Sequence, residues 1–270
     1  MATSTIGSGA RPGQDAGQSF VVKSVAFDAP WAWLAAGWRD MWATPAISLG
    51  YGAAFALLSA AIFYGLSNTS WYALVLALAG GLLIISPLLA LGLYEISRRQ
   101  ETGRISSLAD AIGVKPASPL QLAYVGFGLL FLFSAWLRFA FLLFAIFFGS
   151  TSLPPIERFV PELLFTSHGL GMLIVGTLVG GALAALAFMI SAFSVPHLMV
   201  QRVDALSAMA LSARAVAENP RAMALWAALI AAVMACGIAT MLVGLVFAFP
   251  LIGHATWHAY RAVIGENGSE

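Results

Sequence analysis

The sequence predicts an all-α fold, a polytopic membrane helix bundle, and its overall composition carries this prediction. Of the 270 residues, 60% are hydrophobic and only 9% are charged. A soluble chain has about 25% charged residues. The mean hydropathy of +0.89 agrees with the low charge content. So few charged side chains cannot cover the surface of a water-soluble protein of this length.

Six apolar stretches are long enough to cross a bilayer as helices, since a spanning helix needs about 20 residues. They cover residues 46–66, 71–94, 121–148, 168–193, 222–240 and 244–264. The last two belong to one apolar run, 222–264. As a single helix this run would measure about 65 Å, twice the thickness of the hydrocarbon layer. We therefore predict a tight turn near Gly237–Gly244.

The rest of the chain is expected to form tails around a single transmembrane domain at 25–265. Residues 1–24 are polar and rich in Gly and Ser, which predicts a disordered N-terminal tail, and 266–270 form a C-terminal tail. No early apolar stretch resembles a signal peptide, so the protein is expected to stay in the membrane through its own spans.

The distribution of basic residues predicts the orientation. With six spans, eleven of the 13 Lys and Arg residues fall on one side. The positive-inside rule makes that side cytoplasmic, so we expect a bacterial inner-membrane protein with both termini inside. A five-span alternative moves Arg261 to the other side, and charge alone does not decide between the two.

A degenerate internal repeat favours six spans. Pro45, Pro119 and Pro220 each follow a short stretch with a basic residue and precede a span. Three times a later span carries a proline and then ends in a basic residue. These prolines are Pro87, Pro196 and Pro250. Weak repeats of this kind are common in membrane proteins. We predict three helical hairpins, each introduced by a cytoplasmic interfacial helix.

The clearest interfacial helix is predicted at 31–42, with weaker ones at 106–112 and 206–217 and one on the outer side at 154–165. The first contains four tryptophans, Trp31, Trp33, Trp38 and Trp42. Tryptophan prefers the membrane–water interface. Plain anchoring explains these residues, and a docking surface for another membrane subunit is the functional alternative.

Small residues in the fourth span predict close helix packing. Gly176 and Gly180 form a small-xxx-small motif, which lets helix backbones approach in lipid. Packing within the chain is the favoured interpretation, and a partner helix is the alternative.

Several basic residues are candidates for binding anions or lipid head groups. Arg138 lies inside the third span, where a cation is costly and is usually paired, functional or snorkelling to the interface. Four further arginines are expected to form a cytoplasmic basic belt that contacts lipid head groups. They are Arg98, Arg99, Arg202 and Arg261.

The histidines give a weak metal signal. His254 and His258 are four residues apart and share a helix face, and His197 follows Pro196 at the end of the fourth span. Interfacial hydrogen bonding explains them, while metal or haem ligation is a minor alternative. No cofactor is otherwise predicted.

The sequence contains no recognisable catalytic motif. It lacks a P-loop, a dinucleotide fingerprint, a Gly-x-Ser-x-Gly elbow and a CxxC pair. The net charge of +1 gives no basic face for nucleic acid. We therefore expect a non-enzymatic protein whose partners are membrane lipids and other membrane subunits.

Several strings resemble the Domain of Unknown Function 2189 family of bacterial predicted integral membrane proteins. They are WLAAGWRD at 33–40, Ser86-Pro87, Arg202-Val203-Asp204, Asn219-Pro220 and GHATWHAYR at 253–261. The likeness runs from about residue 20 to 265. It implies a multi-span inner-membrane protein and no particular activity. A link of some relatives to respiratory oxidases implies a respiratory complex as one candidate partner.

Two hypotheses for function follow. The first is an accessory or assembly subunit of a larger membrane complex, based on the tryptophan-rich helix, the small-residue faces and the lack of a catalytic set. The second is a carrier or binder of lipid or another hydrophobic molecule, based on the repeat, Pro87, Pro250 and Arg138. The second requires a lipid-sized space between hairpins, and a solid core would refute it.

Overall fold

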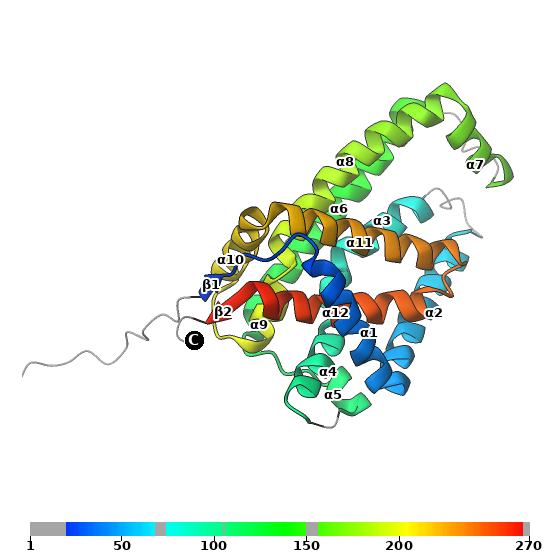
Figure 1. Ribbon diagram of the computed structural model, residues 1–270. Coiled ribbons are helices and arrows are strands. Elements are labelled where there is room, and N and C mark those ends of the chain that lie inside the picture. The colour runs from blue at the N-terminus through cyan, green and yellow to red at the C-terminus, as the bar shows by residue number, and fades with distance from the viewer. Residues whose placement is uncertain (1–19, 68–73, 105, 150–155, 267–270) are drawn as a thin grey trace, which may run out of the picture.

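The computed structural model describes residues 20–67, 74–104, 106–149 and 156–266, and helices dominate this part of the chain (Figure 1). The helices are α1 (Ala29–Ala43), α2 (Pro45–Ser67), α3 (Leu74–Leu89), α4 (Leu91–Glu101), α5 (Leu108–Ile112), α6 (Pro119–Phe148), α7 (Ile156–Phe165), α8 (Ser167–Ser191), α9 (Ser194–Val200), α10 (Ala205–Glu218), α11 (Pro220–Ala239) and α12 (Leu245–Val263). Two short strands, β1 (Phe20–Val22) and β2 (Ile264–Glu266), form an antiparallel pair.

Four helical segments are long and apolar enough to cross a membrane. They are Pro45–Leu66, Pro119–Phe148, Ser167–Val200 and Pro220–Ala239. A fifth crossing results if α3 and α4, which meet at a 40° bend, form one span. Large apolar side chains on these helices are exposed, such as Phe131 and Leu178. Lipid would cover such a surface, so the predicted all-α membrane bundle is confirmed.

The structure places a helix at each predicted span, but the last of them differs in character. The predicted span 244–264 becomes α12, which is not among the helices apolar enough to qualify by composition. Most of its side chains are buried inside the protein. Its polar residues, among them His254 and Thr256, are therefore covered by other helices, and lipid does not surround them.

Proline sets where the long helices begin and bend. Pro45, Pro119 and Pro220 each occupy the first position of a long helix, where the missing backbone N–H costs nothing. Pro87 lies inside α3, which ends two residues later at the 40° bend. Pro250 lies inside α12, which nevertheless continues as one helix.

The turn between α11 and α12 falls within the predicted interval. Met241 and Leu242 both have positive φ values, 53° and 69°, which residues other than glycine rarely adopt. Thr240 stabilises the turn, because its hydroxyl donates to the Gly237 carbonyl at 2.9 Å and accepts from the Gly244 amide at 2.8 Å.

Helix α12 is the centre of the best-packed part of the protein, with α1, α2, α4 and α11 around it. Glycines allow these close approaches. A Cβ atom on Gly37 of α1 would lie 2.6 Å from the backbone nitrogen of Ala255. Trp33 of α1 and Trp226 of α11 meet edge to face, with ring centroids 5.7 Å apart.

The remaining long helices form a second group. Helices α6 and α8 run side by side, contact α3, and extend beyond the rest of the protein with α7 at the far end (Figure 1). Helix α11 packs mainly on α12, with further contacts to α1 and α10. The fold therefore consists of two helix groups, one around α12 and one formed by α3, α6, α7 and α8.

The strand pair joins the two ends of the described chain. The Lys23 amide donates to the Val263 carbonyl at 2.8 Å next to the pair, and Val22 is buried. The predicted N-terminal tail was expected to reach residue 24, so β1 shortens it. Residues 1–19 and 267–270 of the two predicted tails, and Trp71 at the start of the second predicted span, lie outside the described residues.

Candidate functional site

An apolar cleft separates the two helix groups. Its outer cavity, about 680 Å³, lies among α3, α6, α8 and α11. Its inner cavity, about 570 Å³, is lined by α3, α4, α8, α10, α11 and α12. Six residues line both cavities, namely Leu83, Ile84, Gly181, Ala184, Ala231 and Met234. The two cavities are therefore adjacent, and together they are here called the apolar cleft.

Small side chains keep the cleft open. A Cβ atom on Gly181 would have no neighbour within 4 Å. The predicted packing motif behaves differently at its two glycines. A Cβ on Gly180 would meet the Trp136 ring of α6 at 2.7 Å, whereas one on Gly176 would be in ordinary contact with Leu143 at 3.7 Å. Both glycines thus pack within the chain, as favoured, and both also line the outer cavity.

Trp136 holds the wall of the outer cavity together. Its indole N–H donates to the Ala77 carbonyl of α3 at 2.6 Å while its ring lies against α8. One side chain on α6 therefore fixes the positions of both neighbouring helices. The cleft has a rigid wall on this side.

Helix breaks surround the inner cavity. Pro87 and Ala90 line it at the bend between α3 and α4, and Ala192 lines it where α8 gives way to α9. Phe249 also lines it, beside Pro250, where α12 continues without a break. In membrane proteins, interrupted helices near the midplane commonly mark binding sites, because irregular backbone is tolerated where it lines a cavity.

The inner cavity contains few polar groups, and two of them stand out. The indole nitrogen of Trp226 is buried and has no hydrogen-bond partner. Tyr94 is 2% exposed, and its hydroxyl makes no hydrogen bond to any residue that the structure describes. By contrast, the Thr256 hydroxyl donates to the Ile252 carbonyl at 2.7 Å within its own helix.

The histidines form hydrogen bonds within the packed end of the protein. His254 is fully buried and links Ser48 of α2, at 2.9 Å, to Ser97 of α4, at 2.8 Å. His258 contacts a carboxylate oxygen of Asp40 at 2.8 Å.

His197 lies 3.1 Å from the Tyr260 hydroxyl and edge-on to the Phe20 ring. Within the described residues, no three His, Cys, Asp or Glu side chains are placed to hold a metal ion. His197, His254 and His258 therefore do not form a three-residue metal site within the described residues, and each contacts a different polar neighbour.

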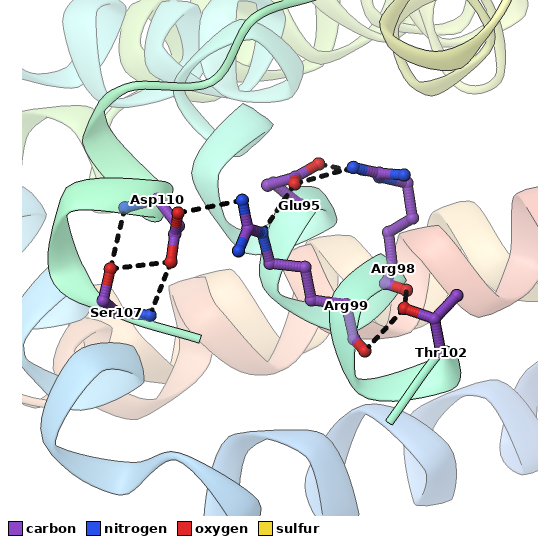
Figure 2. A network of polar contacts seen from close by, with 6 residues as sticks. All are labelled: Glu95, Arg98, Arg99, Thr102, Ser107 and Asp110. Carbon is purple, nitrogen blue, oxygen red and sulfur yellow. Dashed lines mark hydrogen bonds and ion pairs between the residues drawn. The ribbon is translucent and has the colours of Figure 1, made fainter. Parts of the chain in front are cut away.

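Two arginines of the predicted basic belt are engaged by a buried carboxylate (Figure 2). Glu95, only 6% exposed, accepts two hydrogen bonds from Arg98 and one from Arg99, all at 2.8 Å. Arg99 also pairs with Asp110 at 2.8 Å. Hydrogen bonds from Ser107 and the charge of Arg99 hold the pKa of Asp110 below its usual range.

The other predicted basic residues are distributed differently. Arg261 lies 3.5 Å from Glu101. Arg202 is exposed and forms no ion pair with the part of the chain that the structure describes. Arg138 is exposed on α6 and lines neither cavity. Arg98 and Arg99 both pair with Glu95 within α4, and Arg99 also joins α4 to α5 through Asp110.

The tryptophans of α1 divide into two sets. Trp31, Trp38 and Trp42 are exposed, and the rings of Trp38 and Trp42 meet with centroids 5.7 Å apart. Trp33 is 4% exposed and packs on Trp226. Trp33 is therefore a core residue and is unavailable for the partner contact predicted for it.

Sequence reasoning missed Glu95 and Trp226. The spacing of Glu95 to Arg98 and Arg99 was a usable signal, because residues three and four apart meet on a helix. Trp226 lies only six residues after Pro220, near the start of its span, where tryptophan is usual, so the sequence did not mark it as a cavity residue.

Comparison with known proteins gives one match. A family profile described as Predicted integral membrane protein (DUF2189) matches residues 74–200. The match confirms the resemblance to DUF2189. No match was found among curated proteins or among solved structures.

The matched segment, residues 74–200, runs from α3 to α9. It therefore contributes one side of the apolar cleft, including Tyr94 and Gly181. Of the strings that carried the resemblance, Ser86-Pro87 lies within it. The other strings lie outside the matched residues. The family description supports a membrane protein and assigns no activity.

Proposed function

We propose that the protein binds an apolar membrane molecule in the apolar cleft. The observation that carries this proposal is the pair of adjacent cavities between the two helix groups, which share six lining residues. Ligand pockets typically measure about 300–1,000 Å³ and are mostly apolar with a few polar groups. Both cavities fall in this range, and hydrocarbon side chains dominate their walls.

The alternative explanation for such a space, a packing defect, has little support. Protein interiors are close-packed, and an empty space of this size would forfeit many dispersion contacts. The walls are also well fixed, by Trp136 on one side and by the α11–α12 contact on the other. A bilayer surrounds the long helices, so an apolar molecule has a direct source.

Filling the cleft tests the proposal. Gly181→Trp places a large side chain at the junction of the cavities, where the structure has open space. Gly50→Trp on α2 is the matched control, because its Cβ also has no neighbour within 4 Å and it lines neither cavity.

The readout is the apolar molecule retained by the full-length protein after gentle purification, quantified by mass spectrometry of the extract. We expect wild type and Gly50→Trp to retain it and Gly181→Trp to lose it. Equal retention by all three proteins, or by none, would contradict binding in the cleft.

An accessory or assembly role in a membrane complex, including a respiratory one, is the second candidate function. The exposed face of α1 favours it, since Trp31, Trp38 and Trp42 project from a helix whose other face is packed on α12. Replacing Trp38 and Trp42 together with Leu would remove a partner that co-purifies with wild type. A lone protein from native membranes would count against this role.

A six-span topology with both termini in the bacterial cytoplasm completes the proposal. The pairing of β1 with β2 supports it, because ends that lie together require an even number of crossings. Six crossings follow if α3–α4, α8–α9 and α12 are the three returning spans. Each of the three outward spans then begins at a proline after a shorter helix, α1, α5 or α10.

Single cysteines in a Cys236→Ala background test this topology with a membrane-impermeant maleimide. Phe165 and Leu206 are both strongly exposed, and the proposal places them on opposite sides. Phe165→Cys should react in spheroplasts and Leu206→Cys only after lysis. The reverse pattern would invert the orientation, and reaction of both in spheroplasts would refute the topology.

A further inference from the structure

The inner cavity offers hydrogen-bond donors that the protein itself does not use. Trp226 is fully buried, lines the cavity, and its indole N–H has no partner. Indole nitrogen is a donor only, so an oxygen acceptor is what would satisfy it. Buried polar groups are nearly always hydrogen-bonded, so an unpaired donor beside a cavity points to a ligand, which reaches this covered nitrogen once the indole ring turns toward the cavity.

Tyr94 adds a second donor from a different helix. Its side chain lines the same cavity, from α4 immediately after the bend at Ala90. Its hydroxyl has no hydrogen-bond partner in the described part of the chain. Other hydroxyls in this wall donate to carbonyls of their own helices, Ser86 to Leu83 and Ser191 to Ala187. Trp226 and Tyr94 are therefore two donors in this wall that the described part of the chain does not use.

We propose that the inner cavity holds the polar end of an apolar molecule that carries a carbonyl oxygen, with Trp226 and Tyr94 as its hydrogen-bond donors. This inference rests on the proposed function and adds the ligand's chemistry. The carbonyl has two possible sources in a membrane, the ring of an isoprenoid quinone or the ester of a glycerolipid. The hydrocarbon part extends into the outer cavity, whose wall is mainly apolar.

The lining of the cleft limits the charge that its ligand can carry. Alanine, glycine, aliphatic and aromatic side chains line both cavities, and the two walls expose similarly small amounts of polar surface. No charged side chain lines either cavity. A neutral polar group such as a carbonyl therefore fits better than a phosphate or a carboxylate, which would be buried without a counter-ion.

Three probes distinguish the chemistry. Decylbenzoquinone represents the quinone, methyl oleate represents the ester, and 1-octadecene is an apolar chain without an acceptor. Each is added to delipidated full-length protein in mild detergent, and native mass spectrometry measures the bound fraction. We expect the quinone or the ester to bind about three- to tenfold more tightly than 1-octadecene, as one or two hydrogen bonds allow.

Matched variants assign the donors. Trp226→Phe and Tyr94→Phe keep an aromatic ring and delete one donor each. Either substitution should weaken binding of the preferred carbonyl probe about three- to tenfold and leave the binding of 1-octadecene unchanged. Trp257→Phe is the control, because the Trp257 indole N–H is also buried and unpaired but Trp257 does not line the cavity. It should leave every affinity unchanged.

The outcomes separate this inference from the function on which it rests. Equal binding of all three probes, blocked by Gly181→Trp, would keep the cleft as a binding site and overturn the carbonyl. Unchanged carbonyl binding in Trp226→Phe would show that its N–H faces only the Trp33 ring, and would overturn its role. No binding of any probe would remove both proposals.

Discussion

Replacing His254 tests whether buried polar contacts hold α12 to its neighbours. His254 is fully buried and bonded through both ring nitrogens, to Ser48 at 2.9 Å and to Ser97 at 2.8 Å. His254→Phe keeps a ring of similar size and removes both nitrogens. Ser97 then loses its hydrogen-bond partner, while Ser48 keeps only a longer contact to Thr44, at 3.3 Å.

The magnitude follows from the two hydroxyls. A buried polar group left without a partner costs about 1–3 kcal/mol. Ser97 bears this cost fully and Ser48 in part, so we expect a loss of about 2–4 kcal/mol in the free energy of unfolding. For a chain of this size that corresponds to a fall of about 4–16 °C in the unfolding midpoint. Thermal unfolding in mild detergent at one heating rate measures it.

A second substitution makes the reasoning specific. Ser97→Ala in the His254→Phe background removes the unpaired hydroxyl, and replacing both partners by apolar groups is nearly neutral. The double variant should therefore recover about 1–2 kcal/mol of the lost stability. An unchanged midpoint in His254→Phe, or a double variant less stable than His254→Phe, would refute this account of the network.

Three further predictions follow from burial and close contact. Glu95→Gln should lower the free energy of unfolding by about 1–3 kcal/mol because three charge-assisted hydrogen bonds weaken, while Glu218→Gln in an exposed pair should change it by less than about 0.5 kcal/mol. The same melting assay compares the two variants, and equal effects would contradict the role assigned to the burial of Glu95. Gly37→Ala should destabilise the protein by about 1–3 kcal/mol because the added Cβ would clash with the backbone of α12, whereas Gly50→Ala, in open space, should be neutral or stabilising. An unchanged melting temperature in Gly37→Ala would disprove the close approach of α1 to α12. Arg138→Ala should leave the amount of retained apolar molecule unchanged in mass spectrometry, because Arg138 is exposed and lines neither cavity. Loss of the molecule from this variant would place Arg138 in the site.

The sequence predicted the helices well because hydropathy and proline act locally. Pro45, Pro119 and Pro220 begin long helices where expected, and the turn near Gly237–Gly244 is formed. An apolar run too long for one span dictates a turn without any knowledge of tertiary contacts. Such features depend on bilayer thickness and backbone sterics, both of which a sequence reveals.

The site was less predictable because it depends on which helices leave a space between them. Arg138 attracted attention as a charge within an apolar run, yet it lies on the exposed side of α6. Trp33 and Trp31 are two residues apart in a tryptophan-rich helix, yet one is core and the other exposed. Only the placement of α11 beside the α3–α8 group turns Trp226 into a cavity residue.

The central claim is that the apolar cleft binds a membrane molecule, and a cryo-electron microscopy structure of the protein in a native-lipid nanodisc tests it most directly. The account predicts an elongated density between α11 and α8 that runs from the outer cavity to Trp226. A structure in which α11 packs directly against α3 and α8, with the cleft closed by side chains, would contradict it.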